Sequence, residues 1–304
     1  MRFGLVGTGY WAAEVHAPAL TAADDVEFVG VWGRDTAKAA RVADAYGTTA
    51  YEDADALFAE VDAVAFAVPP DVQADLAVRA ARAGCHLLLE KPVALTATAA
   101  HAVRDAAEAA GVASVVFLTS RFVPPIQRWL EETAAEGGWL GGQATLLAAL
   151  DAPGNPFGAS PWRREHGALW DVGPHVLSLL LPVLGPVHEV RAAAGPGDTV
   201  HLALRHEGGA SSQALLSLTM PEAAAGRRLA FYGPAGWREL PGGLAYEATD
   251  ALGVAVAALS RAADGGSPHP CDVRFGADIV DVLAAAQDDL ARTATGTAGA
   301  GASR

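Results

Sequence analysis

Three side chains that can move or orient a proton lie at two places in the sequence. Lys91 follows the apolar run His86–Leu89, inside the triplet Glu90-Lys91-Pro92, and Asp171 and His175 are four residues apart. A spacing of four places a carboxylate and an imidazole on one face of a helix, where both can meet one substrate. Histidine exchanges a proton near neutral pH, and the carboxylate can orient it or the substrate. These residues predict general acid–base chemistry.

Each of these motifs also has a purely structural interpretation. Lys91 could end a surface strand with an exposed ion pair, and Asp171 could cap a helix that packs His175. The position of Lys91 favours function, since parallel sheets bind ligands at the carboxyl ends of their strands. Pro92 restricts the residue before it to extended backbone, and the bond between them could be cis. Gly173, between Asp171 and His175, would leave room for a close approach.

A glycine turn near the N-terminus predicts a dinucleotide-binding site. The apolar strand 2–6 runs into Gly7-Thr8-Gly9-Tyr10-Trp11-Ala12. In a turn of this type Gly7 permits the tight bend, Gly9 lets a pyrophosphate approach the backbone, and Ala12 lets the helix pack on the strand. The amides at the helix start then hold the phosphates. A plain strand-to-helix turn is the alternative, since a chain with 33 glycines produces such strings by chance.

The end of the second strand bears on which nicotinamide cofactor binds. A carboxylate there would bind the ribose of NAD, but the chain reads Val31-Trp32-Gly33-Arg34-Asp35. Gly33 occupies the approximate position of the acid, and Arg34 could clamp the 2′-phosphate of NADP. We therefore expect NADP, with NAD as the alternative. In that alternative Asp35 binds the ribose, although it can instead cap the helix that begins at Thr36.

The first 120 residues alternate short apolar runs with alanine-rich stretches. This alternation predicts an α/β fold, with right-handed crossovers and a parallel sheet covered on both faces. The expected strands are residues 2–6, 27–32, 63–68, 86–89 and 114–117. The expected helices include residues 36–46, 72–83 and 98–110, each closely followed by a glycine. Residues 1–120 are predicted to form a Rossmann domain.

The pattern changes after residue 117. A helix that stops at Gly137-Gly138 precedes strand-like runs separated by Gly and Pro turns. These runs are residues 143–150, 189–194, 199–205, 211–219 and 228–232, with helices expected at 169–181 and 277–291. Residues 121–292 are predicted to form a second α/β domain with an antiparallel sheet, and residues 293–304 a disordered tail.

Charge and composition argue against several classes of partner. The net charge of −14 gives no electrostatic attraction to nucleic acid or to anionic membranes. Cys85 and Cys271 fit neither a disulfide framework nor a metal site, so we expect buried thiols. No secretion signal is visible, and the leucine-rich run 176–184 is too short to span a membrane. These features predict a cytoplasmic protein without a metal.

Taken together and in this order, the motifs resemble the glucose-fructose oxidoreductase / inositol dehydrogenase / MocA (Gfo/Idh/MocA) family of NAD(P)-dependent oxidoreductases. The resemblance covers nearly the whole chain. Four segments carry it: the glycine turn at residues 7–12, residues 83–86 with the Glu-Lys-Pro triplet at 90–92, the pair Arg121-Phe122, and residues 171–175 with their Asp and His. It implies a Rossmann domain followed by an α/β domain with a large, open-faced, mostly antiparallel sheet. Through that sheet the resemblance implies a homodimer or homotetramer.

The resemblance also implies a reaction and its residues. The reaction is hydride transfer between the cofactor and a secondary alcohol or ketone of a sugar, cyclitol or related polyol. Lys91, Asp171 and His175 would surround the reacting carbon, with the lysine or the histidine passing the hydroxyl proton. The implied cofactor contacts are Gly7, Thr8, Gly9, Tyr10, Trp11, Arg34, Val68, Pro69, Glu90, Lys91, Trp162 and Arg163.

The chain departs from the family pattern at two places. Gln73 takes the position of a common histidine, and Trp170 adds bulk ahead of Asp171. Two other functions fit the same scaffold, because a fold does not dictate a function. One is a non-catalytic dinucleotide-binding sensor or regulator, and the other is an NAD-dependent glycosidase that uses transient oxidation.

Overall fold

The chain folds into two compact units. The computed structural model describes residues 1–158 and 160–300. Unit 1 comprises Met1–Val123 and Ala245–Val280, and unit 2 comprises Pro124–Leu244 and Asp281–Arg304. The sequence predicted one boundary near residue 120, whereas the structure returns residues 245–280 to unit 1.

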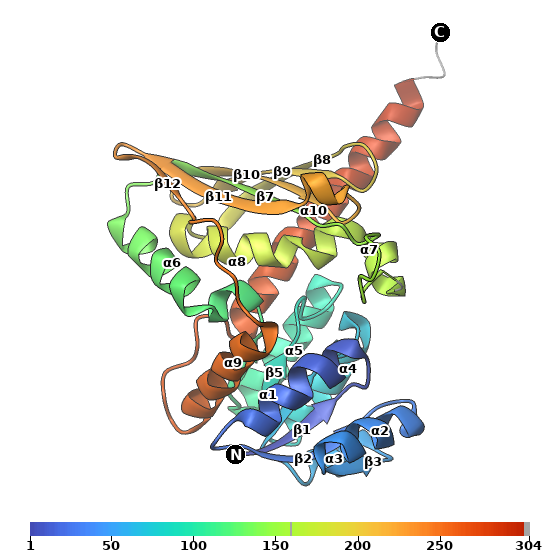
Figure 1. The fold of residues 1–304 in the computed structure, drawn as a ribbon. Helices are drawn as coiled ribbons and strands as arrows, with labels where there is room; N and C mark the ends of the chain where they lie inside the picture. The colour runs from blue at the N-terminus through green and yellow to red at the C-terminus, as the bar shows by residue number, and fades with distance from the viewer. Residues whose placement is uncertain (159, 301–304) are drawn as a thin grey trace. The chain divides into compact units, whose positions relative to one another are not determined.

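Unit 1 is built on a six-stranded parallel sheet (Figure 1). Its strand order is β3-β2-β1-β4-β5-β6, and each neighbouring pair is parallel. The strands are β1 Arg2–Val6, β2 Glu27–Trp32, β3 Thr49–Tyr51, β4 Ala63–Phe66, β5 His86–Leu89 and β6 Ser114–Val116. This order confirms the predicted Rossmann sheet. All carboxyl ends of its strands lie at one edge, where such sheets bind ligands.

Helices cover both faces of this sheet. The helices are α1 Ala17–Ala22, α2 Thr36–Tyr46, α3 Ala54–Phe58, α4 Pro70–Arg82, α5 Ala97–Ala110 and α9 Ala248–Ala263. α1 packs against α2 and α9, and α4 packs against α3 and α5. Left-handed Gly47 and Gly111 end α2 and α5, as the glycine spacing predicted.

The sequence analysis did not predict α9. Its residues Leu252, Val256 and Leu259 are buried at helical spacing, and the helix packs against β5 and β6. Beyond it, the carbonyl oxygen of Cys271 accepts a hydrogen bond of 2.7 Å from the amide of Val116. The segment therefore completes the apolar cover of the parallel sheet, which is why it belongs to unit 1.

Unit 2 contains a second six-stranded sheet, in the order β12-β11-β7-β10-β9-β8. The pair β7–β10 is parallel, and β8–β9, β9–β10, β7–β11 and β11–β12 are antiparallel, which confirms a mostly antiparallel sheet. The strands are β7 Gly141–Leu147, β8 Val187–Ala194, β9 Val200–His206, β10 Ser211–Ser217, β11 Gly226–Gly233 and β12 Gly236–Glu239. Along β9, Leu202 and Leu204 are buried while His201 and Arg205 are exposed, as one covered and one open face require.

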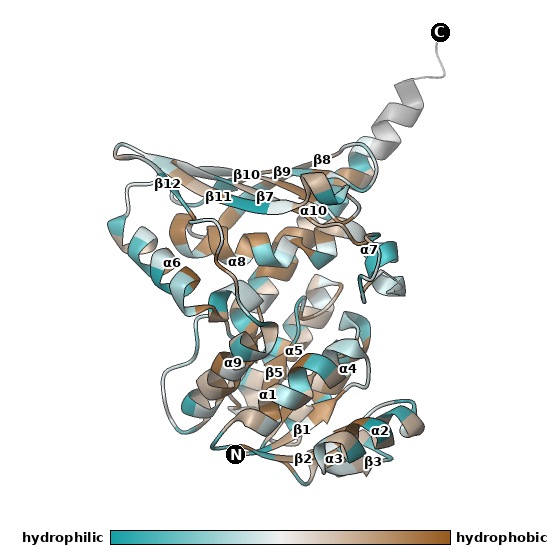
Figure 2. Cartoon of the chain, in the orientation of Figure 1, coloured by the Kyte–Doolittle hydropathy of each residue, from teal (hydrophilic) through white to brown (hydrophobic). Residues whose placement is uncertain are grey.

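The helices α6 (Pro124–Glu136) and α8 (Gly173–Leu184) pack on the covered face. Trp129 of α6 stacks on Phe231 of β11, with ring centroids 6.0 Å apart. Figure 2 shows α8 as largely hydrophobic. The stretch Pro161–Leu184 is long and apolar enough to cross a membrane, yet 78% of its most apolar window is buried. It is therefore a core element of unit 2.

The long helix α10 (Val273–Ala300) begins in unit 1 and continues in unit 2. It extends through residues 293–300, which the sequence analysis assigned to a disordered tail. Adding residues to an existing helix costs far less than nucleating one, so even a weak helix former can continue it. Residues 301–304 of the expected tail lie outside the described residues.

Candidate active site

Gly7 lies where three parallel strands end. Its amide donates a hydrogen bond of 2.9 Å to the carbonyl of Trp32, the last residue of β2. Its φ is 137°, and a Cβ atom there would lie 2.4 Å from the carbonyl oxygen of Ala67, which follows β4. Val68 and Pro69 come next in the chain at this same edge. Only glycine can make this bend, as the sequence predicted.

Gly9 is required for a different reason. Apart from its chain neighbours, none of the described residues has an atom within 4 Å of where a Cβ atom at Gly9 would lie, so the space beside its backbone is open. The third small residue, Ala12, is completely buried and lets the following helix pack closely. An open approach at Gly9 and a packed Ala12 are what a dinucleotide pyrophosphate needs at this turn. The turn therefore fits the expected cofactor.

The helix after the turn begins with one π-helical turn, η1 (Ala12–His16), before α1. Such turns occur frequently at functional sites, and the sequence analysis did not predict this one. Its last residue, His16, has a completely buried side chain, and its Nε2 lies 3.0 Å from Oε1 of Glu90. The same Oε1 accepts a hydrogen bond of 2.5 Å from Nε1 of Trp11. One carboxylate thus connects the glycine turn to the strand end that bears Lys91.

Lys91 lies two residues beyond the end of β5, at the carboxyl edge of the sheet. It is half-buried, its amide donates a 3.2 Å hydrogen bond to Oε2 of Glu90, and its bond to Pro92 is cis. Gln73, on the inner side of α4, forms hydrogen bonds to the backbone on both sides of Lys91. The structure therefore brings Gly7, Trp11, Glu90 and Lys91 to one edge of unit 1.

At the end of β2, a side chain at residue 33 would collide with the side chain of Thr8 as it stands. A Cβ atom on Gly33 would lie 2.5 Å from Cγ2 of Thr8. Asp35 caps α2, because its Oδ1 accepts a hydrogen bond of 3.0 Å from the amide of Lys38. That bond, aided by the charge of Lys38, lowers the pKa of the Asp35 carboxyl. Arg34 is exposed at the start of the same helix.

In unit 2, Asp171 is held by Arg163. Asp171 ends α7 (Pro161–Asp171) and is 7% exposed, and its Oδ2 accepts a hydrogen bond of 3.0 Å from Nε of Arg163. The guanidinium carbon of Arg163 lies 4.7 Å from the ring centre of Phe157 and 4.8 Å from that of Trp162. The two rings fix the arginine that orients Asp171. The sequence analysis named Trp162, Arg163 and Asp171 but missed the pairing of Arg163 with Asp171, and it did not name Phe157.

His175 lies in the first turn of α8 and is half-buried. Gly173, two residues before His175, allows close packing inside unit 2. A Cβ atom on Gly173 would lie 2.8 Å from Cδ2 of Leu283 on α10. The close approach that the sequence predicted at Gly173 is therefore occupied by α10.

Comparison with known proteins agrees with this architecture. A family model described as an oxidoreductase family with an NAD-binding Rossmann fold matches residues 1–118, and the GFO/IDH/MocA C-terminal domain matches residues 131–239. D-xylose 1-dehydrogenase (NADP(+)) 2 of Haloferax volcanii is 31% identical over 240 residues, which are 73% of this chain and 71% of that protein. The chain belongs to the GFO/IDH/MocA family. It is accordingly an NAD(P)-dependent oxidoreductase of the kind that acts on CH–OH groups.

Other known proteins are similar over shorter or longer ranges of the chain. Inositol 2-dehydrogenase of Rhizobium meliloti is 41% identical over 98 residues, 32% of this chain and 29% of that protein. The structure of UDP-N-acetylglucosamine 3-dehydrogenase from Acidithiobacillus ferrooxidans has a TM-score of 0.80 at 24% identity, covering 95% of this chain and 97% of that one. At that identity the likeness shows the family's fold alone.

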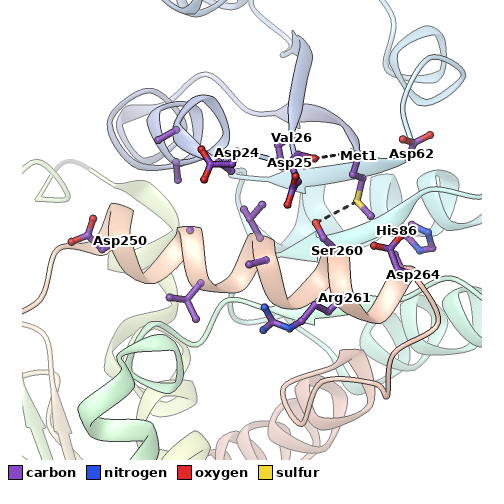
Figure 3. Close-up of a pocket in the computed structure, with 18 of the residues that line it drawn as sticks. Met1, Asp24, Asp25, Val26, Asp62, His86, Asp250, Ser260, Arg261 and Asp264 are labelled. Atoms are coloured by element: carbon purple, nitrogen blue, oxygen red, sulfur yellow. Dashed lines mark hydrogen bonds between the residues drawn. The ribbon is translucent and has the colours of Figure 1, made fainter.

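The amino ends of the parallel strands, opposite the carboxyl edge that bears the glycine turn, border an acidic hollow. Figure 3 shows it between α9 and the residues that begin the strands. Its volume is about 1200 Å³. The carboxylates that line it are Asp24, Asp25, Asp62, Asp250 and Asp264. A dinucleotide carries phosphates, so this lining disfavours it.

Proposed function

We propose that this protein transfers a hydride between NADP(H) and a secondary alcohol or ketone of a sugar, cyclitol or related polyol. The observation that carries the proposal is the contact of Glu90 with both Trp11 and Lys91, because it joins the glycine turn to a lysine at the ligand-binding edge. Relatives named as xylose, apiose, glucoside and inositol dehydrogenases support the substrate class.

The proposed division of labour follows from the chemistry of each group. The bound dinucleotide would supply or accept the hydride at its nicotinamide. In oxidation, Lys91 or His175 takes the hydroxyl proton as the hydride leaves the same carbon, and Asp171 orients the substrate. Proposed cofactor contacts are Gly7, Thr8, Gly9, Tyr10, Trp11, Arg34, Val68, Pro69, Glu90, Lys91, Trp162 and Arg163.

Three observations at the end of β2 support NADP over NAD. Thr8 fills the space that an acidic side chain at residue 33 would need. Asp35 is already used as a helix cap, which leaves no carboxylate at the expected place for ribose hydroxyls. Arg34 is exposed beside it, where its fork of donors suits a phosphate. A relative named for NADP(+) agrees with this preference.

The test is the absorbance of the nicotinamide during incubation with NADP⁺ or NAD⁺ and a panel of aldoses, cyclitols and their oxidised forms. Net formation or consumption of reduced cofactor with at least one of them supports the proposal. Release of sugar from a glycoside without net reduction would instead identify a glycosidase. Cofactor binding without turnover on any substrate would identify a sensor.

The open face of the second sheet supports a proposal about assembly. We infer that it forms a homodimer or homotetramer, since exposed residues such as His201 and Arg205 alternate with buried ones along β9. A charge-reversing Arg205→Glu variant that still elutes at the wild-type mass in light scattering would contradict this interface.

We also propose a reducing, cytoplasmic location. The thiols of Cys85 and Cys271, which are buried and form no disulfide with each other, support it.

A further inference from the structure

We propose that Gln73 is a positioning residue that holds Lys91 in the geometry for reaction. The inference rests on the proposed function, because it assigns Gln73 a part in the chemistry of Lys91. Gln73 lies on α4, 18 positions before Lys91, and its side chain is completely buried. It is also the residue that the sequence analysis noted in place of a histidine common in the family pattern.

The amide of Gln73 makes four hydrogen bonds to one short segment. Its Oε1 accepts from the amide of Glu90 at 2.8 Å. Its Nε2 carries two hydrogens and has three acceptors in range, the carbonyl oxygens of Glu90 at 2.8 Å, Val93 at 3.1 Å and Pro92 at 3.2 Å, so one hydrogen is shared between two of them. These partners flank Lys91 on both sides. A displacement of the Lys91 backbone would therefore strain the hydrogen bonds that Gln73 makes to the residue before Lys91 and to the residues after it.

The segment needs such a partner because the sheet no longer supplies one. The last pairing of β5 with β6 is at Leu89, whose carbonyl accepts a 2.7 Å hydrogen bond from the amide of Phe117. Beyond Leu89 the backbone leaves the ladder while its surroundings stay buried, as at Val93. Buried backbone groups without partners are costly, and a primary amide satisfies a donor and acceptors together. Neither a carboxylate nor a thioether of the same length can do both.

The carboxylate of Glu90 adds a second constraint on the same lysine. It accepts from the Lys91 amide at 3.2 Å and from Nε1 of Trp11 at 2.5 Å. Gln73 fixes the backbone of Glu90, from which this carboxylate extends. Gln73 therefore aligns Lys91 with the glycine turn as well as holding it in place. A misplacement of about 1 Å at a reacting group can reduce a rate roughly 100-fold.

The decisive experiment is a double-mutant cycle of Gln73→Met and Lys91→Ala in the full-length protein. We expect Gln73→Met to lower kcat roughly 10- to 100-fold, with the dissociation constant of NADPH within about twofold of wild type. If Gln73 acts through Lys91, the double variant is no slower than Lys91→Ala alone. The inference would be overturned if the loss of kcat in the double variant were the product of the two single losses, or if Gln73→Met had the kcat of wild type.

Leu76→Ala is the matched control for loss of stability. Leu76 is buried on the same helix, so its truncation destabilises unit 1 without removing a bond to the lysine segment. We expect it to lower the melting temperature while kcat stays near wild type. If Gln73→Met does not fold, Gln73→Asn replaces it, because this amide is one methylene too short to keep all four bonds. A wild-type kcat in a folded Gln73→Asn variant would contradict the positioning role.

A spectroscopic readout separates failure of this inference from failure of the proposed function. The chain has two lysines, Lys38 and Lys91, so protein labelled with ¹³Cε-lysine gives two lysine signals that Lys38→Arg assigns. We expect Gln73→Met or Gln73→Asn to shift the Lys91 signal and Leu76→Ala to leave it unchanged. Absence of turnover in wild type would refute the proposed function. An unshifted Lys91 signal in a folded Gln73 variant would refute the placement of Lys91 by Gln73.

Discussion

The two edges of the parallel sheet in unit 1 differ in charge and in backbone geometry. The carboxyl edge has an open glycine turn, an exposed Arg34 and the segment of Lys91. The amino edge is lined by five aspartates around an open hollow (Figure 3). Both edges have space for a ligand, but in the amino-edge hollow the five aspartates outnumber the one arginine, Arg261, whereas the carboxyl edge offers phosphates an open glycine turn and the exposed Arg34. Space alone therefore does not identify the cofactor site.

The direction of the helices explains part of this difference. Each of α2, α4 and α5 begins just after a strand ends, so its amino end points to the carboxyl edge. Helix amino ends carry a partial positive charge and free amides. A protein with a net charge of −14 can thus hold an anionic dinucleotide at one edge while its carboxylates gather at the other. The comparison can be tested at each edge.

The largest expected effect is on turnover at the carboxyl edge. Lys91→Ala should lower kcat roughly 1000-fold, because acid–base groups contribute about 100- to 10,000-fold. The dissociation constant of NADPH, measured by fluorescence titration, should change by less than about twofold. Lys38→Ala is the matched control for turnover, since it removes the other lysine. Equal rates in Lys91→Ala and wild type would remove Lys91 from the mechanism.

A smaller effect is expected on cofactor choice. Arg34→Ala should weaken NADPH binding about 10- to 100-fold, since hydrogen bonds to charged groups contribute about 1.5–3 kcal/mol. NADH binding should be unaffected, and Arg82→Ala, which removes an exposed arginine at the far end of α4, should affect neither cofactor. Calorimetric titration of both cofactors measures this. Equal losses for NADPH and NADH would show that Arg34 does not bind the 2′-phosphate.

The two edges also predict unequal sensitivity to acid. His269 stacks on Phe122 just beyond β6, and burial, together with Arg121 and Arg261, lowers its pKa to about 4. Burial also lowers the pKa of His86 at the amino edge. A histidine with a lowered pKa is neutral when folded, so unfolding takes up protons as the pH falls below about 6.5. The free energy of unfolding should therefore fall between about pH 6.5 and about pH 4.

Urea unfolding at about pH 7.5 and about pH 5 checks this expectation. His269→Asn keeps an acceptor for the amide of Cys271 and should reduce the loss of stability in acid. His86→Asn should reduce it less, because its pKa is shifted less. The reverse order would show that the amino edge dominates the acid response.

The smallest effect is expected from the acidic hollow. Asp24→Asn with Asp25→Asn should leave NADPH affinity within about twofold of wild type. The five residues of β1 span roughly 16 Å, which exceeds the screening length of about 8–10 Å at physiological salt. Isothermal titration of the double variant measures this. A clear gain in affinity would place the dinucleotide near the hollow and reverse the comparison.

Local patterns predicted much of unit 1. The glycine turn, the alternation of strands and helices and the cap at Asp35 follow from rules that act over a few residues, and each is present. The strand β3 has three residues, too few to show an alternation of buried and exposed side chains. The sequence of α9 indicates an amphipathic helix but does not indicate which sheet the helix covers. Gln73 was visible as a departure from the family pattern. Its hydrogen bonds were not, since they depend on how α4 packs beside the end of β5.

The most direct test of the central claim uses the two lysines as reporters at the carboxyl edge. Lys38 lies in the first turn of α2, beside Arg34, and Lys91 lies at the end of β5. With ¹³Cε-lysine protein, NADP⁺ should shift both signals, whereas NAD⁺ should shift the Lys91 signal and leave the Lys38 signal unchanged. If saturating NADP⁺ shifts neither signal, the dinucleotide does not bind at the glycine turn, and the account is wrong.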